Sequence, residues 1–123
     1  MSYQFSEISK HRLSTAHTDL QALFNTVIKY RDCSVLCGYR SRHDQNQLYQ
    51  QGKSHAMYPQ SKHNHYPSLA VDVVPFPVDW KDINRFYHFA GFVFGIAAQM
   101  GIRMKWGGDF NGFFDGPHFE LID

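Results

Sequence analysis

Two long segments of the chain carry apolar residues at the spacing of an amphipathic helix. The first covers residues 14–32, where a hydroxyl-bearing residue can cap the start of the apolar run. The second opens near residue 79, where aspartates can cap it, and ends at Gly101, the residue type that most often follows a helix. A shorter helix is predicted over residues 43–51, because good helix formers there precede Gly52.

Four shorter runs are rich in β-branched or aromatic residues and predict strands. They cover residues 33–39, 69–74, 102–106 and 118–122. The order of these elements predicts an α+β fold in which helices pack on a small, mainly antiparallel sheet. Residues 53–68, between the helix predicted over residues 43–51 and the strand predicted over residues 69–74, form a long loop in which apolar residues show no sustained period. Such a loop usually carries function when it occurs in a small domain.

The length and composition fit a single domain, residues 1–123. Hydrophobic residues make up 43% of the chain, which supports a packed core and argues against disorder. The formal net charge is +1 without runs of like charge, so we expect no nucleic-acid partner and no stable association with a membrane. The first residues lack the basic and apolar segments of a signal peptide, and a soluble product made in the cytoplasm is expected.

Cys33 and Cys37 are the two cysteines of the chain, and they lie on a predicted strand. Their C-x3-C spacing matches neither a zinc knuckle nor a redox pair. We therefore expect two buried free thiols.

Histidines and carboxylates near the predicted turns suggest a catalytic zinc site. Such sites use three protein ligands, drawn from histidine and carboxylate side chains, and leave a fourth position for water. His63 or His65 in the long loop, Asp72 on the adjoining strand and His118 on the last strand can form this set. Asp115, which precedes His118 in a Gly-Pro turn, is a candidate general base. Each residue also has an ordinary structural explanation, since loops carry histidines and aspartates stabilise turns.

Three blocks of the sequence resemble the M15 metallopeptidases and occur in that family's order. The blocks are Gly38-Tyr39-Arg40-Ser41 with Gln45 and Leu48-Tyr49, then Ser61-Lys62-His63 to Ala70-Val71-Asp72, then Trp106-Gly107-Gly108-Asp109 followed by Asp115-Gly116-Pro117-His118-Phe119-Glu120. The family includes D-alanyl-D-alanine carboxypeptidases, the VanX and VanY types, and phage L-alanyl-D-glutamate endolysins. The resemblance covers the chain from about residue 38 to residue 120 and implies a fold like that of hedgehog and DD-peptidase proteins.

The resemblance also implies a role for each matched residue. The zinc ligands that it implies are His63, Asp72 and His118. Asp115 stands where the family has its general base, and Arg40 where an arginine stabilises the oxyanion or anchors the substrate. An arginine suits both tasks because its fixed fork of donors stays charged near neutral pH. Ser61, which opens the S-x-H block, is expected to contact the substrate.

The spacing of the second block departs from the family's pattern. In the usual block, S-x-H-x-x-G-x-A-x-D, the aspartate stands seven positions after the histidine, whereas Asp72 stands nine positions after His63 and the usual glycine is replaced around Pro67-Ser68. His65 has the usual spacing to Asp72. We favour His63 as the ligand, because Ser61-Lys62-His63 matches as a unit and loops accept insertions at small cost. With His65 as the ligand, His63 would take the serine's place.

These features together predict a zinc-dependent peptidase of the endolysin type that cleaves the L-alanyl-D-glutamate bond of peptidoglycan stem peptides. Such a protein waits in the host cytoplasm and reaches the wall through an independently opened membrane. A D-alanyl-D-alanine carboxypeptidase or dipeptidase is the alternative, since the same residues would serve it. A third hypothesis is a non-catalytic, zinc-containing wall-binding module of the hedgehog kind. The expected partner is the stem peptide, and a monomer is expected.

Overall fold

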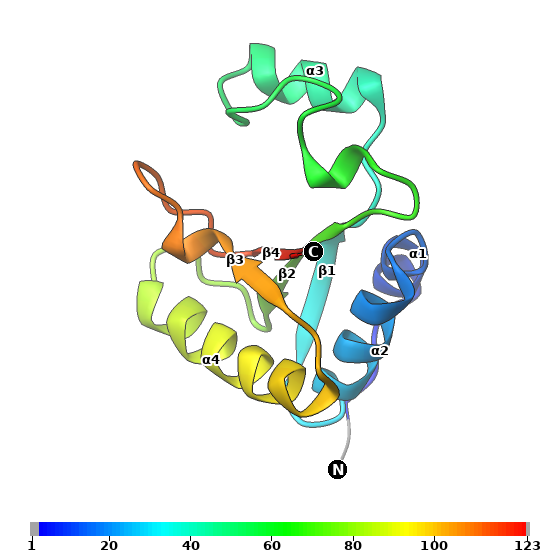
Figure 1. Cartoon of the computed structure of the whole chain (residues 1–123). Helices are drawn as coiled ribbons and strands as arrows, with labels where there is room; N and C mark the ends of the chain where they lie inside the picture. Colours follow the sequence, from blue (N-terminus) through cyan, green and yellow to red (C-terminus); the bar gives the residue numbers. More distant parts are fainter. Residues whose placement is uncertain (1–2, 123) are drawn as a thin grey trace.

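The structure, a computed structural model, describes residues 3–122 and is shown in Figure 1. The elements of this range, in chain order, are α1 (Glu7–Ser14), α2 (Thr18–Val27), β1 (Cys33–Cys37), α3 (Arg42–Gln50), η1 (Lys62–Asn64), β2 (Ala70–Pro75), α4 (Ile83–Met100), β3 (Met104–Trp106), η2 (Gly107–Asp109) and β4 (His118–Leu121). The strands form an antiparallel sheet in the order β1-β2-β4-β3. The predicted α+β fold with an antiparallel sheet is therefore confirmed.

The start of the chain differs from the prediction. The segment before residue 14 forms α1, which the apolar pattern did not indicate because this helix buries little more than Ser9 and Leu13. The next helix begins at Thr18, since Thr15 instead ends α1 and forms the corner between the two helices. The Thr15 hydroxyl donates to the Arg12 carbonyl and accepts the backbone N–H of Tyr39, which anchors the end of β1.

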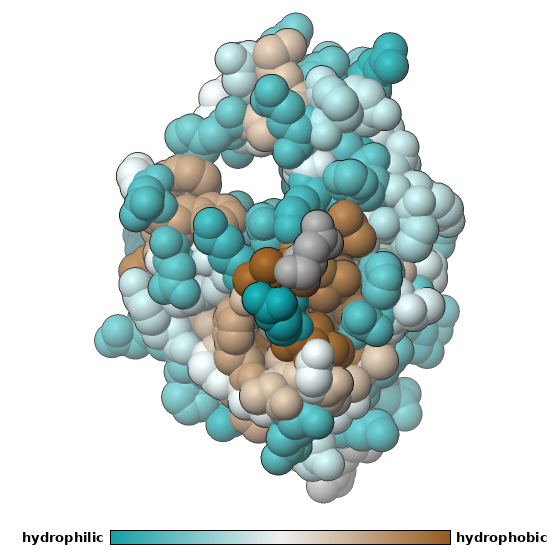
Figure 2. Space-filling view, in the orientation of Figure 1, coloured by the Kyte–Doolittle hydropathy of each residue, from teal (hydrophilic) through white to brown (hydrophobic). Residues whose placement is uncertain are grey.

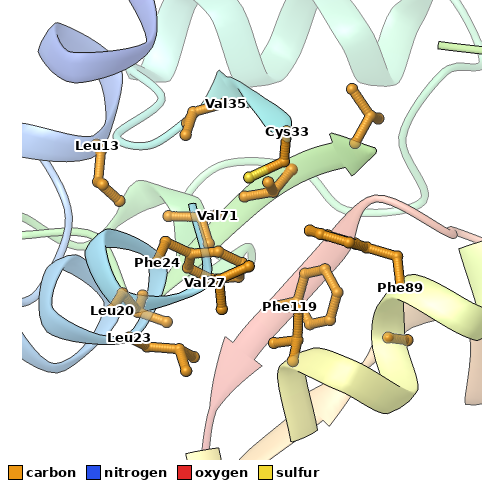
Figure 3. Close-up of a cluster of buried hydrophobic side chains, with 14 of the residues drawn as sticks. Leu13, Leu20, Leu23, Phe24, Val27, Cys33, Val35, Val71, Phe89 and Phe119 are labelled. Carbon is orange, nitrogen blue, oxygen red and sulfur yellow. The ribbon is translucent and has the colours of Figure 1, made fainter. Parts of the chain in front are cut away.

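The hydrophobic core lies between one face of the sheet and helices α2 and α4, as Figure 3 shows. Side chains alternate between the two faces of a strand. Val71, Val73 and Phe119 therefore enter the core, where all three are fully buried. Cys33 joins them, and burial, followed by the charge of Asp32, raises the pKa of its thiol to about 12.

The opposite face of the sheet carries the polar side chains of the central strands. Asp72 on β2 pairs with His118 on β4, and Glu120 lies two residues farther along β4, so all three point away from the core. Figure 1 places α3 and the loop after it on this side of the sheet, with α4 on the other. The pairing of β2 with β4 thus brings two predicted site residues side by side.

Within residues 3–122, no helix has both the length and the apolar character needed to span a membrane.

Candidate active site

Two histidines converge on one oxygen of Asp72. His63 lies in η1, 1% exposed, and its Nε2 is 3.2 Å from Asp72 Oδ1. His118 Nδ1 is 3.3 Å from the same oxygen. Ser61 caps η1 by accepting the backbone N–H of His63, and Asn64 completes the capping box. The local sequence therefore sets the position of His63, while the β2–β4 register sets that of His118.

The other nitrogen of each imidazole already has an acceptor. His63 Nδ1 lies 2.7 Å from the carbonyl oxygen of Gly38, and His118 Nε2 lies 2.8 Å from Glu120 Oε1. Because these oxygens can only accept, each ring donates on that side. A neutral His63 and a neutral His118 would then both present lone pairs to the Asp72 carboxylate. Such an arrangement requires a positive charge at its centre, supplied either by protons or by a metal ion.

The pKa shifts express the same requirement. Burial opposes ionisation of His63, but the Asp72 carboxylate outweighs it and raises the pKa of this imidazole to about 10. The pKa of His118 is also raised, since hydrogen bonds to Asp72 and Glu120 outweigh its burial. Conversely, burial of Asp72 is outweighed by His63 and His118, which hold its pKa well below the ordinary range. The chemistry of this donor set fits a divalent metal that replaces the two protons.

Arg40 approaches the cluster from the end of β1. Its Nη2 lies 3.3 Å from Asp72 Oδ2, and its Nη1 donates to Gln45 Oε1 at 3.0 Å. Gln45 is fully buried, and its Oε1 also accepts from Asn64. The Gln45 amide nitrogen donates to Ser54 and to the Ala56 carbonyl. All hydrogen-bonding groups of this amide are thus used to connect Arg40 with α3, η1 and the following loop.

Asp115 stands at the edge of the cluster. Its Oδ2 is 3.9 Å from His118 Nδ1, and its side chain is 40% exposed. Burial and then the charge of Asp72 raise its pKa, against the opposing effect of nearby cations. The turn that carries Asp115 packs closely on Gly107, where a Cβ atom would lie 2.1 Å from the Asp115 carbonyl oxygen. This contact explains why glycine follows Trp106, whose indole N–H holds the same turn through the Gly116 carbonyl.

Cys37 lies beside the cluster, which its spacing did not suggest. A bulge in β1 after Val35 makes Cys37, rather than Leu36, the partner of Asp72. One ligand atom each from Cys37, His63 and Asp72 all lie within 4.8 Å of one another, which makes these three residues a possible metal-binding group. Cys37 is half-buried and free, so the expectation of a buried thiol is wrong for this residue.

The cluster borders an open cavity of about 580 Å³. Arg40, Ser61 and Asp115 line the same cavity, as does Glu120. Its far wall is aromatic, and there the ring of Phe113 stacks on His55 with centroids 4.1 Å apart. Figure 2 shows the molecule hollowed between the α3 region and the segment that follows β3. The cluster is therefore reachable from solvent through this hollow.

The structure brings His63, and not His65, against Asp72. His65 is exposed and ends η1, outside the cavity lining. The two residues that lengthen the loop therefore lie between His63 and β2. Glu120, Gln45 and Cys37 are site neighbours to which the sequence analysis gave no role.

Comparisons with known proteins agree on the class of protein. A sequence model of the phage L-alanyl-D-glutamate peptidases matches residues 1–122. The fold is similar to the crystal structure of the L-Ala D-Glu endopeptidase ChiX from Serratia marcescens, with a TM-score of 0.83 and 30% sequence identity. The match covers 97% of this chain and 90% of the Serratia chain. The chain therefore belongs to the phage L-alanyl-D-glutamate peptidase family.

Proposed function

We propose that the protein is a zinc-dependent peptidase that hydrolyses the L-alanyl-D-glutamate bond in stem peptides of bacterial peptidoglycan. The observation that carries this proposal is the convergence of His63 Nε2 and His118 Nδ1 on Asp72 Oδ1, beside an open cavity. Membership of a peptidase family supports the reaction class, and the Serratia endopeptidase supports the choice of bond.

The residues fit zinc because two imidazoles and one carboxylate form a common ligand set of hydrolytic zinc enzymes. Bound by His63, Asp72 and His118, zinc would supply a Lewis acid that polarises the scissile carbonyl and makes water more acidic. The Gly38 carbonyl accepts a hydrogen bond from His63 Nδ1, and the Glu120 carboxylate accepts one from His118 Nε2. These bonds leave the lone pairs of His63 Nε2 and His118 Nδ1 for the metal.

Asp115 is the proposed general base. Its carboxylate lies beside the ligand set and opens to the cavity, where it can accept a proton from the attacking water and pass it to the leaving amine. The raised pKa of Asp115 brings it closer to neutral pH than an ordinary aspartate, which favours this exchange.

Arg40 is the proposed anchor for negative charge. Two of its five N–H groups serve Asp72 and Gln45 in the described contacts, and the side chain borders the cavity. The remaining donors can bind the developing oxyanion or a carboxylate of the substrate. Ser61 borders the same cavity and is proposed to contact the stem peptide.

Variants at paired positions test these roles. His63→Ala should abolish zinc binding, whereas His65→Ala should retain it. Asp115→Ala should lower kcat by about 10²- to 10⁴-fold while zinc stays bound, because a general base contributes on that order. Asp19→Ala, which removes an exposed carboxylate on α2, serves as the control. Loss of zinc together with activity in Asp115→Ala would exclude the proposed role.

Cys37 gives a specific reason to keep the wall-binding module as a second candidate. If its sulfur completed a four-ligand site, no position would remain for water and the metal would be structural. The peptidase proposal expects Cys37→Ser to retain both zinc and hydrolysis. A large loss of zinc affinity in this variant, together with a wild-type protein that binds peptidoglycan without cutting it, would favour the module.

A further inference from the structure

We propose that Glu120, held in place by Lys62, is a positioning residue that fixes the ring and the tautomer of His118 for metal binding. This inference rests on the proposed function, because it concerns the same metal site. It assigns roles to two residues beyond the proposed ligands and the general base.

Strand β4 places Glu120 beside the Nε2 edge of the His118 ring, opposite the Nδ1 edge that faces Asp72. The two residues are separated by one position and lie on the same face of the strand, with Phe119 turned into the core between them. Glu120 Oε1 is 2.8 Å from His118 Nε2, whereas Asp72 and Asp115 face His118 Nδ1. The imidazole is therefore held from opposite sides by different carboxylates.

This contact selects one tautomer. A carboxylate accepts a hydrogen bond but donates none, so in the neutral imidazole Nε2 carries the proton and Nδ1 keeps its lone pair. The negative charge of Glu120 also makes Nδ1 a better donor to a cation, as carboxylates paired with metal-bound histidines generally do. His63 obtains the same orientation from a backbone carbonyl, that of Gly38.

Lys62 restrains Glu120 in turn. Its Nζ lies 3.6 Å from Glu120 Oε2 and also donates to the Leu121 carbonyl. The Lys62 carbonyl accepts the backbone N–H of Leu69, so the residue is fixed at both ends. The turn Ser61-Lys62-His63 thus supplies the proposed ligand His63. It also supplies Lys62, which holds the Glu120 carboxylate against the second histidine ligand, His118.

Both oxygens of Glu120 are engaged by these contacts. Oε1 faces His118 and Oε2 faces Lys62, and the side chain is 18% exposed. Although Glu120 borders the cavity, each of its oxygens already has a charged or ring-nitrogen partner. The geometry therefore distinguishes its role from that of Asp115.

The test is the zinc dissociation constant, measured by competition with a chromophoric chelator. Glu120→Ala should raise this constant by about 10- to 100-fold, the usual effect of removing such a partner. Glu120→Gln, which keeps an acceptor oxygen but loses the charge, should show a smaller increase, and Lys62→Met a smaller one still. Glu7→Gln, at a side chain that is 92% exposed, should leave the constant unchanged. A Glu120→Ala constant within twofold of wild type would overturn the inference.

A measurement on the wild-type protein avoids any variant that fails to fold. Long-range ¹H–¹⁵N spectra should show the His118 Nε2 protonated in the zinc-bound protein and Nδ1 bound to the metal. Zinc on Nε2 would overturn the inference while leaving the peptidase proposal intact. If the wild-type protein binds no zinc, the metal site of the proposed function fails first, so the two failures are distinguishable.

Discussion

Zinc binding at pH 7 should release about one proton from His63, and more to the extent that His118 is protonated, because zinc must replace the protons that these imidazoles hold in the metal-free protein. The pKa of His63 is raised to about 10, and that of His118 is raised in the same direction. Removing the proton from His63 at pH 7 costs about 4 kcal/mol at about 1.4 kcal/mol per pH unit. Zinc affinity should therefore increase about tenfold per pH unit near neutrality from His63 alone, and more steeply where His118 is also protonated.

Isothermal titration calorimetry gives the proton count directly. The apparent enthalpy of zinc binding is measured at pH 7 in several buffers, and its slope against the buffer's ionisation enthalpy is the number of protons released. His65→Ala should leave the count unchanged, whereas His63→Ala should give no zinc-binding heat from which protons could be counted. A cysteine ligand would add a proton, because thiols bind metals as thiolates. A slope of zero in the wild-type protein would mean that zinc displaces no proton from His63, contrary to the raised pKa of this imidazole.

Further outcomes follow from the packing and charges. Gly107→Ala should reduce both zinc affinity and activity, because its Cβ would lie 2.8 Å from that of Asp115. Gly95→Ala, at an exposed position of α4 where a Cβ would meet nothing within 4 Å, should raise the free energy of unfolding by about 0.5–1 kcal/mol without changing activity. Phe119→Ala should lower the free energy of unfolding by about 3–5 kcal/mol in denaturant titrations, because this fully buried ring fills the centre of the core. Because the pKa of His63 is raised from 6.5 to about 10 on folding, protonation of His63 stabilises the folded metal-free protein, and this stabilisation is complete below about pH 6.5. The melting temperature of the metal-free protein should therefore fall as the pH rises from 6.5 through about 10. With zinc bound, the melting temperature should instead rise with pH.

The sequence pattern predicted the elements that have strong local signals. Helix α4 was expected to end at Gly101, and Gly101 adopts the left-handed conformation at that helix end. Helix α1 was missed because it contributes few apolar residues to the core. Side chains alternate between the two faces of a strand, so an inward-facing Phe119 implies that His118 and Glu120 share the opposite face. That these two side chains are neighbours could therefore be predicted from the sequence.

Other parts of the site depend on tertiary structure. The bulge after Val35 reverses the alternation of β1 and turns Cys37 toward Asp72, and no local signal marks it. Gln45 reads as an ordinary helical residue, yet it is fully buried by partners from three segments. The choice between His63 and His65 likewise depended on how the loop folds, because the spacing to Asp72 allowed either residue.

The most direct test of the proposed activity is digestion of purified peptidoglycan by the full chain, with mass-spectrometric identification of the new peptide ends. Parallel samples contain the protein as purified, the protein treated with a chelator, and the treated protein with zinc restored. We expect new amino-terminal D-glutamate in the first and third samples and none in the second. Release of D-alanine would move the protein to the carboxypeptidase class, and intact stem peptides despite bound zinc would contradict the proposed peptidase activity.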